Sequence, residues 1–421
     1  MRNETVRNEL TPPCDVVLFS TADWDHPFWT NKQHVAAQLA ERGFRVLYVE
    51  SLGLRRPTAS GRDLARIGRR LRRAWQSVRQ VRENLWVASP LAIPWHDSAL
   101  VRRLNDRMLS AWLARACRRL GFERPIAWTY NPLAGKLIAS LNPSLVVYHA
   151  VDDLSAAPHM ARPTIESAER ALAHAADLVL TTSESLQARL IGDNPHATHY
   201  LPNVADFDHF SQARRDGPLP ADLAAIPSPR IGFVGALSSY KVDFELIAAV
   251  ARARPDWQWV LIGQVGEGQP ETSISALGLP NVHLLGPRPY AELPNYLRGF
   301  DLATIPCPAN DYTRAMFPMK FFEYLAAGRQ VVVSNVPALI SFGDVCQRVN
   351  SPEEFIEVVA RILQASPGVN EAGVQVAARH TWRWRMDQML VLMDRAWRER
   401  QRISQGPVSS RGGAIPQAKA G

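Results

Sequence analysis

The chain has 421 residues, which is too long for one ordinary domain and suits two. Its 46% hydrophobic and 21% charged residues are typical of a globular protein, and no apolar run is long enough to predict a membrane-spanning helix. The net charge of +8 predicts an anionic partner. The four cysteines are scattered without a C-x-x-C pair, which argues against a disulfide framework or a metal site, and the N-terminus is a poor signal peptide, which predicts a cytoplasmic protein.

The first half of the chain predicts strands and helices in alternation. Short apolar strands are expected over 15–20, 45–50, 125–130, 144–151 and 177–181, and helices over 33–42 and 164–175. Such an order predicts a parallel sheet with helices on both faces, which makes the fold class α/β.

The loop after the first strand, 21–31, is dense in polar and aromatic side chains. Loops at this position form ligand sites in α/β domains. Trp24 and Trp29 offer apolar faces for sugar rings, so with Asn31 they are candidate acceptor-binding residues. His26 is a candidate catalytic base. A hydrogen-bonded loop histidine and tryptophans packed against the neighbouring domain are the alternatives.

A strongly basic segment follows, with ten arginines and one acid between Arg55 and Arg82. An anionic membrane surface and a solvated helix face are equally good interpretations of this segment. Nucleic acid is disfavoured, because no nucleic-acid-binding module accompanies the charge.

Two acids, Asp152 and Asp153, follow the strand 144–151. An acid at the carboxyl edge of a sheet can act as a general base on an acceptor hydroxyl, which makes Asp152 a candidate catalytic residue. A helix cap is the alternative. His149 lies within the strand and is expected to be a core histidine with its hydrogen bonds satisfied.

The segment 206–228 is rich in proline and glycine and is expected to be a linker between an N-terminal domain, 1–205, and a C-terminal domain, 229–379. Strands then resume over 230–234, 257–262, 281–285, 302–305 and 330–334, with helices over 242–253, 291–299 and 352–364. A final helix is expected over 382–401. The tail 404–421 is rich in Gly, Ser, Pro and Ala and is expected to be disordered.

The strongest local motif is the run FPMKFFEYLAAG, 317–328. Pro318 and the closing glycine predict a helix whose N-terminus suits a diphosphate. Lys320 adds positive charge there, and Glu323, three residues later on the same face, can accept hydrogen bonds from a ribose. A surface ion pair on an amphipathic helix is the alternative.

The run P-x-K-x-x-E-Y-L-A-A-G resembles the donor-site helix of GT-B glycosyltransferases, especially those near family 4, also called group 1. The segments 231–235 (IGFVG), 260–263 (VLIG) and 281–286 (NVHLLG) are similar to strands and loops of the same family. The segments 24–27 (WDHP) and 147–153 (VYHAVDD) resemble bacterial teichuronic acid and exopolysaccharide glycosyltransferases.

The resemblance implies a GT-B fold, with two Rossmann-like domains whose parallel sheets face each other across a cleft. It places the donor on the C-terminal domain and the acceptor on the N-terminal domain, to which the last helix crosses back. It adds Gly235, Lys241, Gly263 and Arg288 to the candidate donor-binding residues.

Two positions depart from the family pattern. Ala315 stands where the family has a first acid, so the contact to the donor sugar is expected from Asn310, Asp311 or Arg314. Ala236 stands where a phosphate-binding arginine is expected.

The expected function is transfer of a sugar from a nucleoside diphosphate sugar to a glycan or lipid-linked acceptor in cell-surface or exopolysaccharide synthesis, without a metal or cofactor. The basic segment would hold such an enzyme at the inner face of the plasma membrane. A sugar-nucleotide epimerase and a non-catalytic subunit of a polysaccharide assembly are the alternatives. The residues leave the base, the sugar, the acceptor, retention or inversion, and the oligomeric state open.

Overall fold

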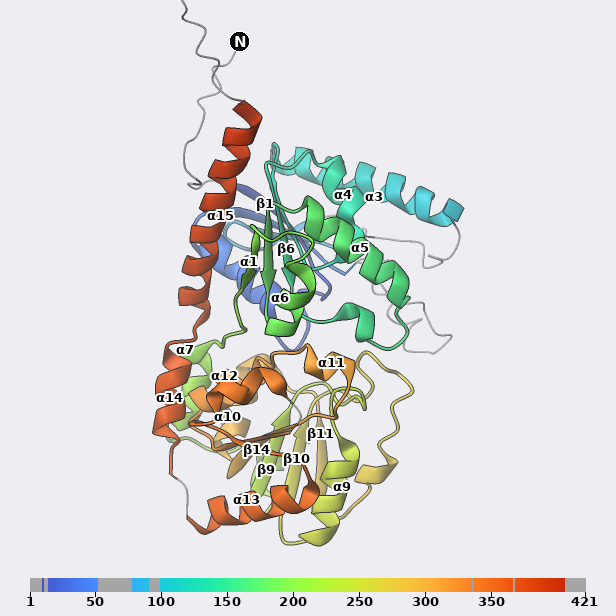
Figure 1. Cartoon of the computed structure of the whole chain (residues 1–421). Coiled ribbons are helices and arrows are strands. Elements are labelled where there is room, and N and C mark those ends of the chain that lie inside the picture. The colour runs from blue at the N-terminus through green and yellow to red at the C-terminus, as the bar shows by residue number, and fades with distance from the viewer. Residues whose placement is uncertain are drawn as a thin grey trace, which may run out of the picture.

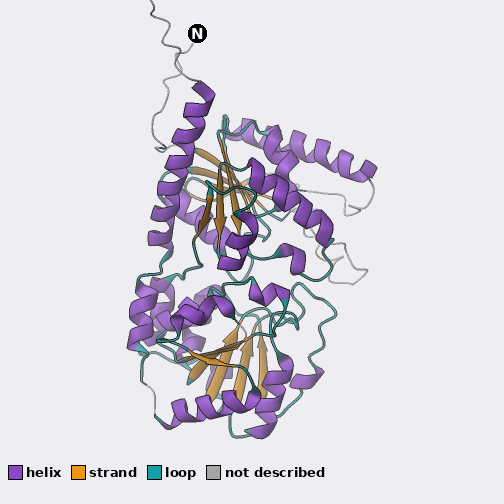
Figure 2. Cartoon of the chain, in the orientation of Figure 1, coloured by secondary structure: helices purple, strands orange, loops and turns teal. Residues whose placement is uncertain are grey.

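The computed structural model describes residues 10, 14–51, 78–90, 99–334, 336–365 and 368–405. It consists of two α/β domains stacked end to end, each with a central sheet covered by helices (Figures 1 and 2). Most of the predicted basic segment, 52–77, and the predicted tail from residue 406 lie outside the described residues. Within the described part of the chain, no helix is both long and apolar enough to cross a membrane.

The N-terminal sheet has eight strands in the order β3-β4-β2-β1-β5-β6-β7-β8. The strands are β1 (Asp15–Phe19), β2 (Arg45–Val49), β3 (Arg79–Arg82), β4 (Leu85–Ala88), β5 (Ile126–Thr129), β6 (Leu145–Ala150), β7 (Leu178–Thr181) and β8 (Thr198–Tyr200). All neighbours are parallel except β3 and β4. Every residue of β5, β6 and β7 is buried, as expected of strands covered on both faces.

In the described part of the N-terminal domain, helices flank this sheet on both faces, and α15 (Trp382–Gln405) from the end of the chain joins them. Those of the N-terminal domain itself are α1 (Asn31–Glu41), α3 (Ala99–Leu120), α4 (Gly135–Ser140), α5 (Arg162–Ala175) and α6 (Glu184–Leu190). The hairpin β3–β4 and the long helix α3 were not predicted from the sequence. The buried side of α3 carries Leu109, Leu113, Ala116 and Cys117 at helical spacing, but arginines between them mask the pattern.

The C-terminal sheet has six parallel strands in the order β11-β10-β9-β12-β13-β14. The strands are β9 (Arg230–Val234), β10 (Gln258–Ile262), β11 (Val282–Gly286), β12 (Leu302–Pro306), β13 (Val331–Ser334) and β14 (Gln347–Val349). The helices are α9 (Phe244–Ala253), α10 (Leu293–Arg298), α11 (Asp311–Arg314), α12 (Lys320–Ala326), α13 (Pro352–Gln364) and α14 (Glu371–Ala378). Both domains therefore have the open parallel sheet that forms ligand sites at its carboxyl edge.

The segment 206–228 is not the free linker that was expected. It forms α7 (Phe207–Ser211) and α8 (Ala221–Ala224), and Phe210 and Leu223 are buried in the core of the C-terminal domain. Proline and glycine break the segment into short helices, but its apolar side chains still pack against α10. It therefore belongs structurally to the C-terminal domain.

The chain crosses between the domains at two adjacent points. Ala205 pairs with Thr381 in an isolated β-bridge, and the N–H of Ala205 donates to the carbonyl of His380 at 3.1 Å. After the second crossing, α15 (Trp382–Gln405) runs along the N-terminal domain beside α1, as Figure 1 shows. It is four residues longer than the predicted 382–401, and its buried Met389 is part of the N-terminal core.

Candidate active site between the domains

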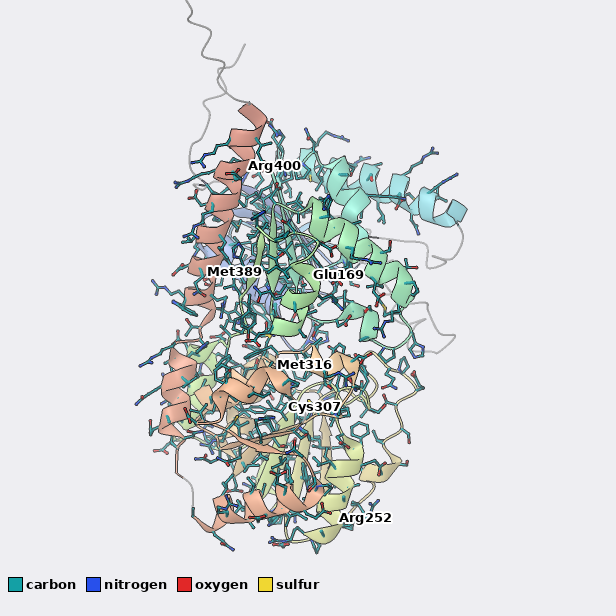
Figure 3. All side chains as sticks on the ribbon, viewed as in Figure 1. Glu169, Arg252, Cys307, Met316, Met389 and Arg400 are labelled. Carbon is teal, nitrogen blue, oxygen red and sulfur yellow. The ribbon has the colours of Figure 1, made fainter. Side chains whose placement is uncertain are left out.

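A pocket of about 1070 Å³, including the space at its open mouth, lies between the two domains. Most predicted site residues line it: His26, Trp29, Asn31, Asp152, Gly235, Lys241, Pro318, Lys320 and Glu323. Cys307 and Met316, labelled in Figure 3, lie on the C-terminal side of the pocket, at the face of that domain turned toward the other. Sequence reasoning therefore brought together residues that lie far apart along the chain.

The C-terminal side of the pocket is built on β9 and α12. Gly235 follows β9 with φ +155°, and a Cβ there would stand 3.0 Å from Cε of Lys320. The glycine thus leaves room for the lysine side chain. The ammonium lies 5.4 Å from the ring centre of Phe233, and burial lowers the pKa of Lys320.

Glu323 lies one turn further along α12 and also faces the pocket. Burial raises its pKa to about 7, against the opposing effect of Lys320. The next residue, Tyr324, fixes the helix to the sheet, because its hydroxyl oxygen accepts a hydrogen bond from the N–H of Val234 at 2.8 Å. The carboxyl group is thus held rigidly where it can bind a hydroxyl-rich ligand.

Lys241 lies on the same side of the pocket, in the loop between β9 and α9. Burial alone would lower its pKa, but Tyr240, Glu267 and Asp152 raise it overall. The ammonium therefore stays positive in a site largely closed to water, which suits a bound phosphate.

The two acids after β6 have different surroundings. Asp153 caps a short turn by accepting hydrogen bonds from the N–H groups of Ser155 and Ala156, and it pairs with Arg189 at 2.7 Å. This ion pair holds the pKa of Asp153 below its usual value in spite of burial. Asp152 instead faces the pocket and accepts a hydrogen bond from the hydroxyl of Tyr312 at 3.1 Å. Of the two, Asp152 is the acid available for chemistry.

Asp152 lies within electrostatic range of three lysines, Lys32, Lys241 and Lys320. The first comes from the N-terminal domain and the other two from the C-terminal domain. The pocket therefore gathers positive charge from both domains around one carboxylate.

His26 lines the pocket but is engaged by its neighbours. Its Nε2 lies 3.6 Å from Oε1 of Glu267, and its Nδ1 lies 2.9 Å from the carbonyl of Phe28. Burial lowers the pKa of His26, but Glu267 more than offsets this and raises it overall. Both ring nitrogens of His26 therefore have partners, as expected of a hydrogen-bonded loop histidine.

The aromatic residues of the first loop divide into two. Trp24 is 7% exposed, belongs to the N-terminal core and does not line the pocket, so a role in binding acceptor is wrong for it. Trp29 lines the pocket and packs on Tyr290 of the C-terminal domain, with ring centres 6.2 Å apart. Asn31 also lines the pocket and donates to the side chain of Asn203.

Two predicted donor-binding residues lie outside the pocket lining. Gly263 supports the loop from beneath, since a Cβ there would stand 1.8 Å from the carbonyl oxygen of Gly235. Arg288 pairs with Asp222 at 2.5 Å and with the hydroxyl of Tyr296 at 2.7 Å, which turns it toward α8 and α10. The linker expected at 206–228 supplies its acid partner, so this contact could not be foreseen.

The position of the missing first acid is part of the contact between the domains. The carbonyl of Ala315 accepts a hydrogen bond from Ser183 Oγ at 2.8 Å. The three proposed substitutes, Asn310, Asp311 and Arg314, do not line the pocket, whereas Tyr312 does. Asn310 caps α11 because its side chain accepts from the N–H of Thr313, and Asp311 and Arg314 pair with each other.

His149 is buried, as expected, but its hydrogen bonds are not satisfied. Neither ring nitrogen has a partner among the described residues, and burial lowers the pKa of His149 to about 3. It is therefore a neutral core residue, packed against the rings of Tyr130 and Trp128.

The sequence analysis missed several pocket residues: Lys32, Asn203, Glu267, Tyr290 and Tyr312. Lys32 directly follows the polar loop at 21–31, a signal that was available, while the others have no local signature. In the described part of the chain, no cluster of three or more His, Cys, Asp or Glu side chains could hold a metal ion.

A known protein family matches the part of the chain that forms the C-terminal side of this pocket. Residues 228–365 match the family described as Glycosyl transferases group 1. This part of the chain is similar to group 1 glycosyltransferases. The predicted resemblance is thus confirmed for the domain that carries Gly235, Lys320 and Glu323.

A curated relative matches about half of the chain. Over 228 residues the chain is 30% identical to TuaH of Bacillus subtilis (strain 168), a teichuronic acid biosynthesis glycosyltransferase by name. The match covers 51% of this chain and 57% of TuaH, so the chain matches little more than half the length of that relative.

Solved structures share the arrangement of both domains. The sucrose-phosphate synthase of Thermosynechococcus elongatus aligns with a TM-score of 0.67 at 18% identity, over 93% of this chain and 100% of that one. Anabaena Alr3699/HepE in complex with UDP and glucose aligns with a TM-score of 0.62 at 15% identity, over 89% and 98%. The predicted GT-B architecture is confirmed, and identities this low concern the fold alone.

Proposed function

We propose that the chain transfers a sugar from a nucleoside diphosphate sugar to a hydroxyl of a glycan or lipid-linked acceptor in the synthesis of a cell-surface polysaccharide. The observation that carries the proposal is that Lys320 and Glu323 of α12 both line the same pocket. This pocket lies between the domain that matches the group 1 glycosyltransferases and a second Rossmann-like domain. The names of TuaH and of the HepE complex with UDP and glucose agree with it.

The proposed roles follow from the positions of the charges. Lys320 and Lys241 neutralise the diphosphate as the bond to the sugar breaks, so no bound metal is required for this step. Glu323 accepts hydrogen bonds from the ribose. Asp152 faces the same space from the N-terminal domain and is placed to receive the proton of the acceptor hydroxyl or to orient that hydroxyl.

Thermal unfolding with UDP, GDP, ADP, dTDP and their common sugars tests the donor site. A ligand at about a hundred times its dissociation constant adds about 2.7 kcal/mol to the free energy of unfolding, an easily measured shift. We expect one nucleotide to stabilise the wild type and this effect to disappear in Glu323→Ala. If none of them stabilises the protein, the transferase proposal fails.

Product analysis with the active nucleotide sugar then separates the alternatives. A transferase releases nucleoside diphosphate only when an acceptor is present. Conversion of the sugar nucleotide without acceptor would instead identify an epimerase, and donor binding without turnover across a broad acceptor panel would identify a non-catalytic subunit.

We further propose that the protein is cytoplasmic and binds the inner face of the plasma membrane. The basic segment from Arg55 to Arg82 motivates this, and the described helix α3 adds to it. Its exposed side carries arginines and two apolar residues: Arg103, Arg107, Arg115, Arg118, Arg119, Leu104 and Met108. Arginines near an anionic surface contribute about 1 kcal/mol each.

Vesicle flotation tests this placement. We expect the wild type to float with vesicles of phosphatidylglycerol at low salt and not with phosphatidylcholine, and Arg103→Glu/Arg107→Glu to bind less. Arg252→Glu is the control, because Arg252 lies at the far end of the C-terminal domain, as Figure 3 shows. Recovery with neither lipid would refute membrane binding, and equal recovery with both would refute binding through the charge of the arginines.

A further inference from the structure

We propose that Lys32 is a donor-binding residue contributed by the N-terminal domain, which places a third ammonium group on the diphosphate across the cleft from Lys241 and Lys320. The inference rests on the proposed function and deepens it, because the donor would then be held by both domains. Among the described residues of the N-terminal domain, Lys32 is the one lysine or arginine in the lining of the pocket.

The surroundings of Lys32 favour the binding of an anionic ligand. The side chain is 7% exposed, lines the interdomain pocket and has its pKa lowered by burial. In the described part of the chain its ammonium makes no hydrogen bond or ion pair, and it lies over the ring of Tyr130, whose centre is 5.6 Å away. A buried ammonium without such partners is costly and is usually satisfied by a ligand.

Asp152 attracts this ammonium but does not neutralise the pocket by itself. The same carboxylate also attracts Lys241 and Lys320, and Lys241 repels Lys32. Glu267 also attracts Lys241, and Glu323 attracts Lys320. Lys32 therefore shares its one attracting carboxylate with two lysines that have acids of their own. A bound diphosphate would supply further negative charge beside Lys32.

On the opposite wall an uncharged alanine stands where the family resemblance predicts an arginine, and Lys32 could take over that role. Ala236 follows Gly235 on the C-terminal side and lines the pocket without a charged group. Lys32 starts from the second position of α1, on the facing domain. Moving a positive charge from position 32 to position 236 therefore tests the inference directly.

Isothermal titration of wild type, Lys32→Met, Lys32→Arg and Lys32→Met/Ala236→Arg with UDP, GDP, ADP, dTDP and the corresponding nucleosides makes this test. We expect Lys32→Met to weaken the preferred nucleoside diphosphate about tenfold or more and to leave the nucleoside unchanged. Lys32→Arg should bind like the wild type, and the double variant should recover much of the loss.

Glu323→Ala is the matched comparison, because the loss of a ribose contact weakens the binding of nucleoside and of nucleoside diphosphate alike. Unfolding of the ligand-free proteins adds a second readout: Lys32→Met should melt at or above the wild-type temperature, since a buried charge without a partner is removed. A lower melting temperature with unchanged diphosphate binding would show a structural role and overturn the inference. Absence of nucleotide binding in the wild type would instead overturn the proposed function and the inference with it.

Discussion

Ionisable side chains in the pocket influence one another because protein surrounds them on nearly every side. Burial raises the pKa of Glu323 and lowers the pKa of Lys320, as it does for any acid and any base. Lys241 departs from this pattern because Glu267 and Asp152 support its charge. Protonation in this site is therefore coupled to ligand binding.

Glu323 makes the stability of the ligand-free protein depend on pH. Its pKa is raised from 4.5 to about 7, so between these values the folded protein keeps a proton that the unfolded chain releases. The free energy of unfolding contributed by this group is therefore present at low pH and is lost as pH rises through 7. We expect Glu323→Gln to remove this loss and to gain about 2–3 kcal/mol over the wild type between pH 5 and pH 8, measured by urea unfolding. Parallel pH profiles for the two proteins would contradict the shift.

Asp152 is expected to matter for turnover rather than for donor binding. Asp152→Asn removes a negative charge from a site that binds phosphates, so we expect the affinity for nucleoside diphosphate to stay equal or to increase. The transfer rate should fall about a hundredfold or more, as when a general base is lost. Tyr312→Phe removes only the hydrogen bond to Asp152 and should have a smaller effect. Weaker nucleotide binding in Asp152→Asn would exclude this division of roles.

Predictability at this scale depends on how local a signal is. Lys320 and Glu323 share one helix face, and a helix N-terminus is visible in sequence, so both were found. Trp24 was misplaced because the direction of a loop side chain depends on tertiary packing. Tyr312 becomes a neighbour of Asp152 only when the two domains meet, and Lys32 comes near Asp152 only when the N-terminal domain folds, so no spacing along the chain encodes either contact.

At the scale of elements, the two loops that follow β9 and β10 depend on a close backbone contact. Gly263 has φ +155°, and a Cβ there would collide with the carbonyl oxygen of Gly235. We expect Gly263→Ala to lower the free energy of unfolding by about 3 kcal/mol or more and to weaken nucleotide binding, because the loop under Lys320 must move. Gly192→Ala is the control, since a Cβ there meets nothing within 4 Å. Equal melting temperatures for both variants would show that the loop adapts.

Helices and strands whose apolar residues recur at regular spacing were predicted to within a few residues. The helix α13 (Pro352–Gln364) matches its predicted bounds. The segment 206–228 was not, because proline and glycine indicate breaks without showing whether the pieces dock. The long α3 was missed because arginines interrupt the apolar spacing of its buried side.

At the scale of the whole molecule, the end of the chain stabilises the domain in which the chain begins. Met389 of α15 is 1% exposed within the N-terminal core, while Val391 on the same helix is 54% exposed. Figure 3 shows Met389 on the side of α15 that faces this domain. We expect Met389→Ala to cost about 2–4 kcal/mol of unfolding free energy. Val391→Ala should stay within about 0.5 kcal/mol of the wild type. Similar losses in the two variants would mean that α15 is not anchored there.

The alternation of strands and helices predicted two domains without any structure, and the motif run predicted which one carries the donor side. The pairing of residues across the cleft was beyond reach, because it depends on the relative orientation of two separately folded units.

The paired crossings at Ala205 and Thr381 have a mechanical consequence. Because the two chain segments are joined by a β-bridge, they form one narrow spine rather than two independent tethers. Two domains that are joined at one narrow place can rotate relative to each other about it. Any such rotation would change the distance between Lys32 and Lys320, so the charge that faces a ligand depends on the relative orientation of the two domains.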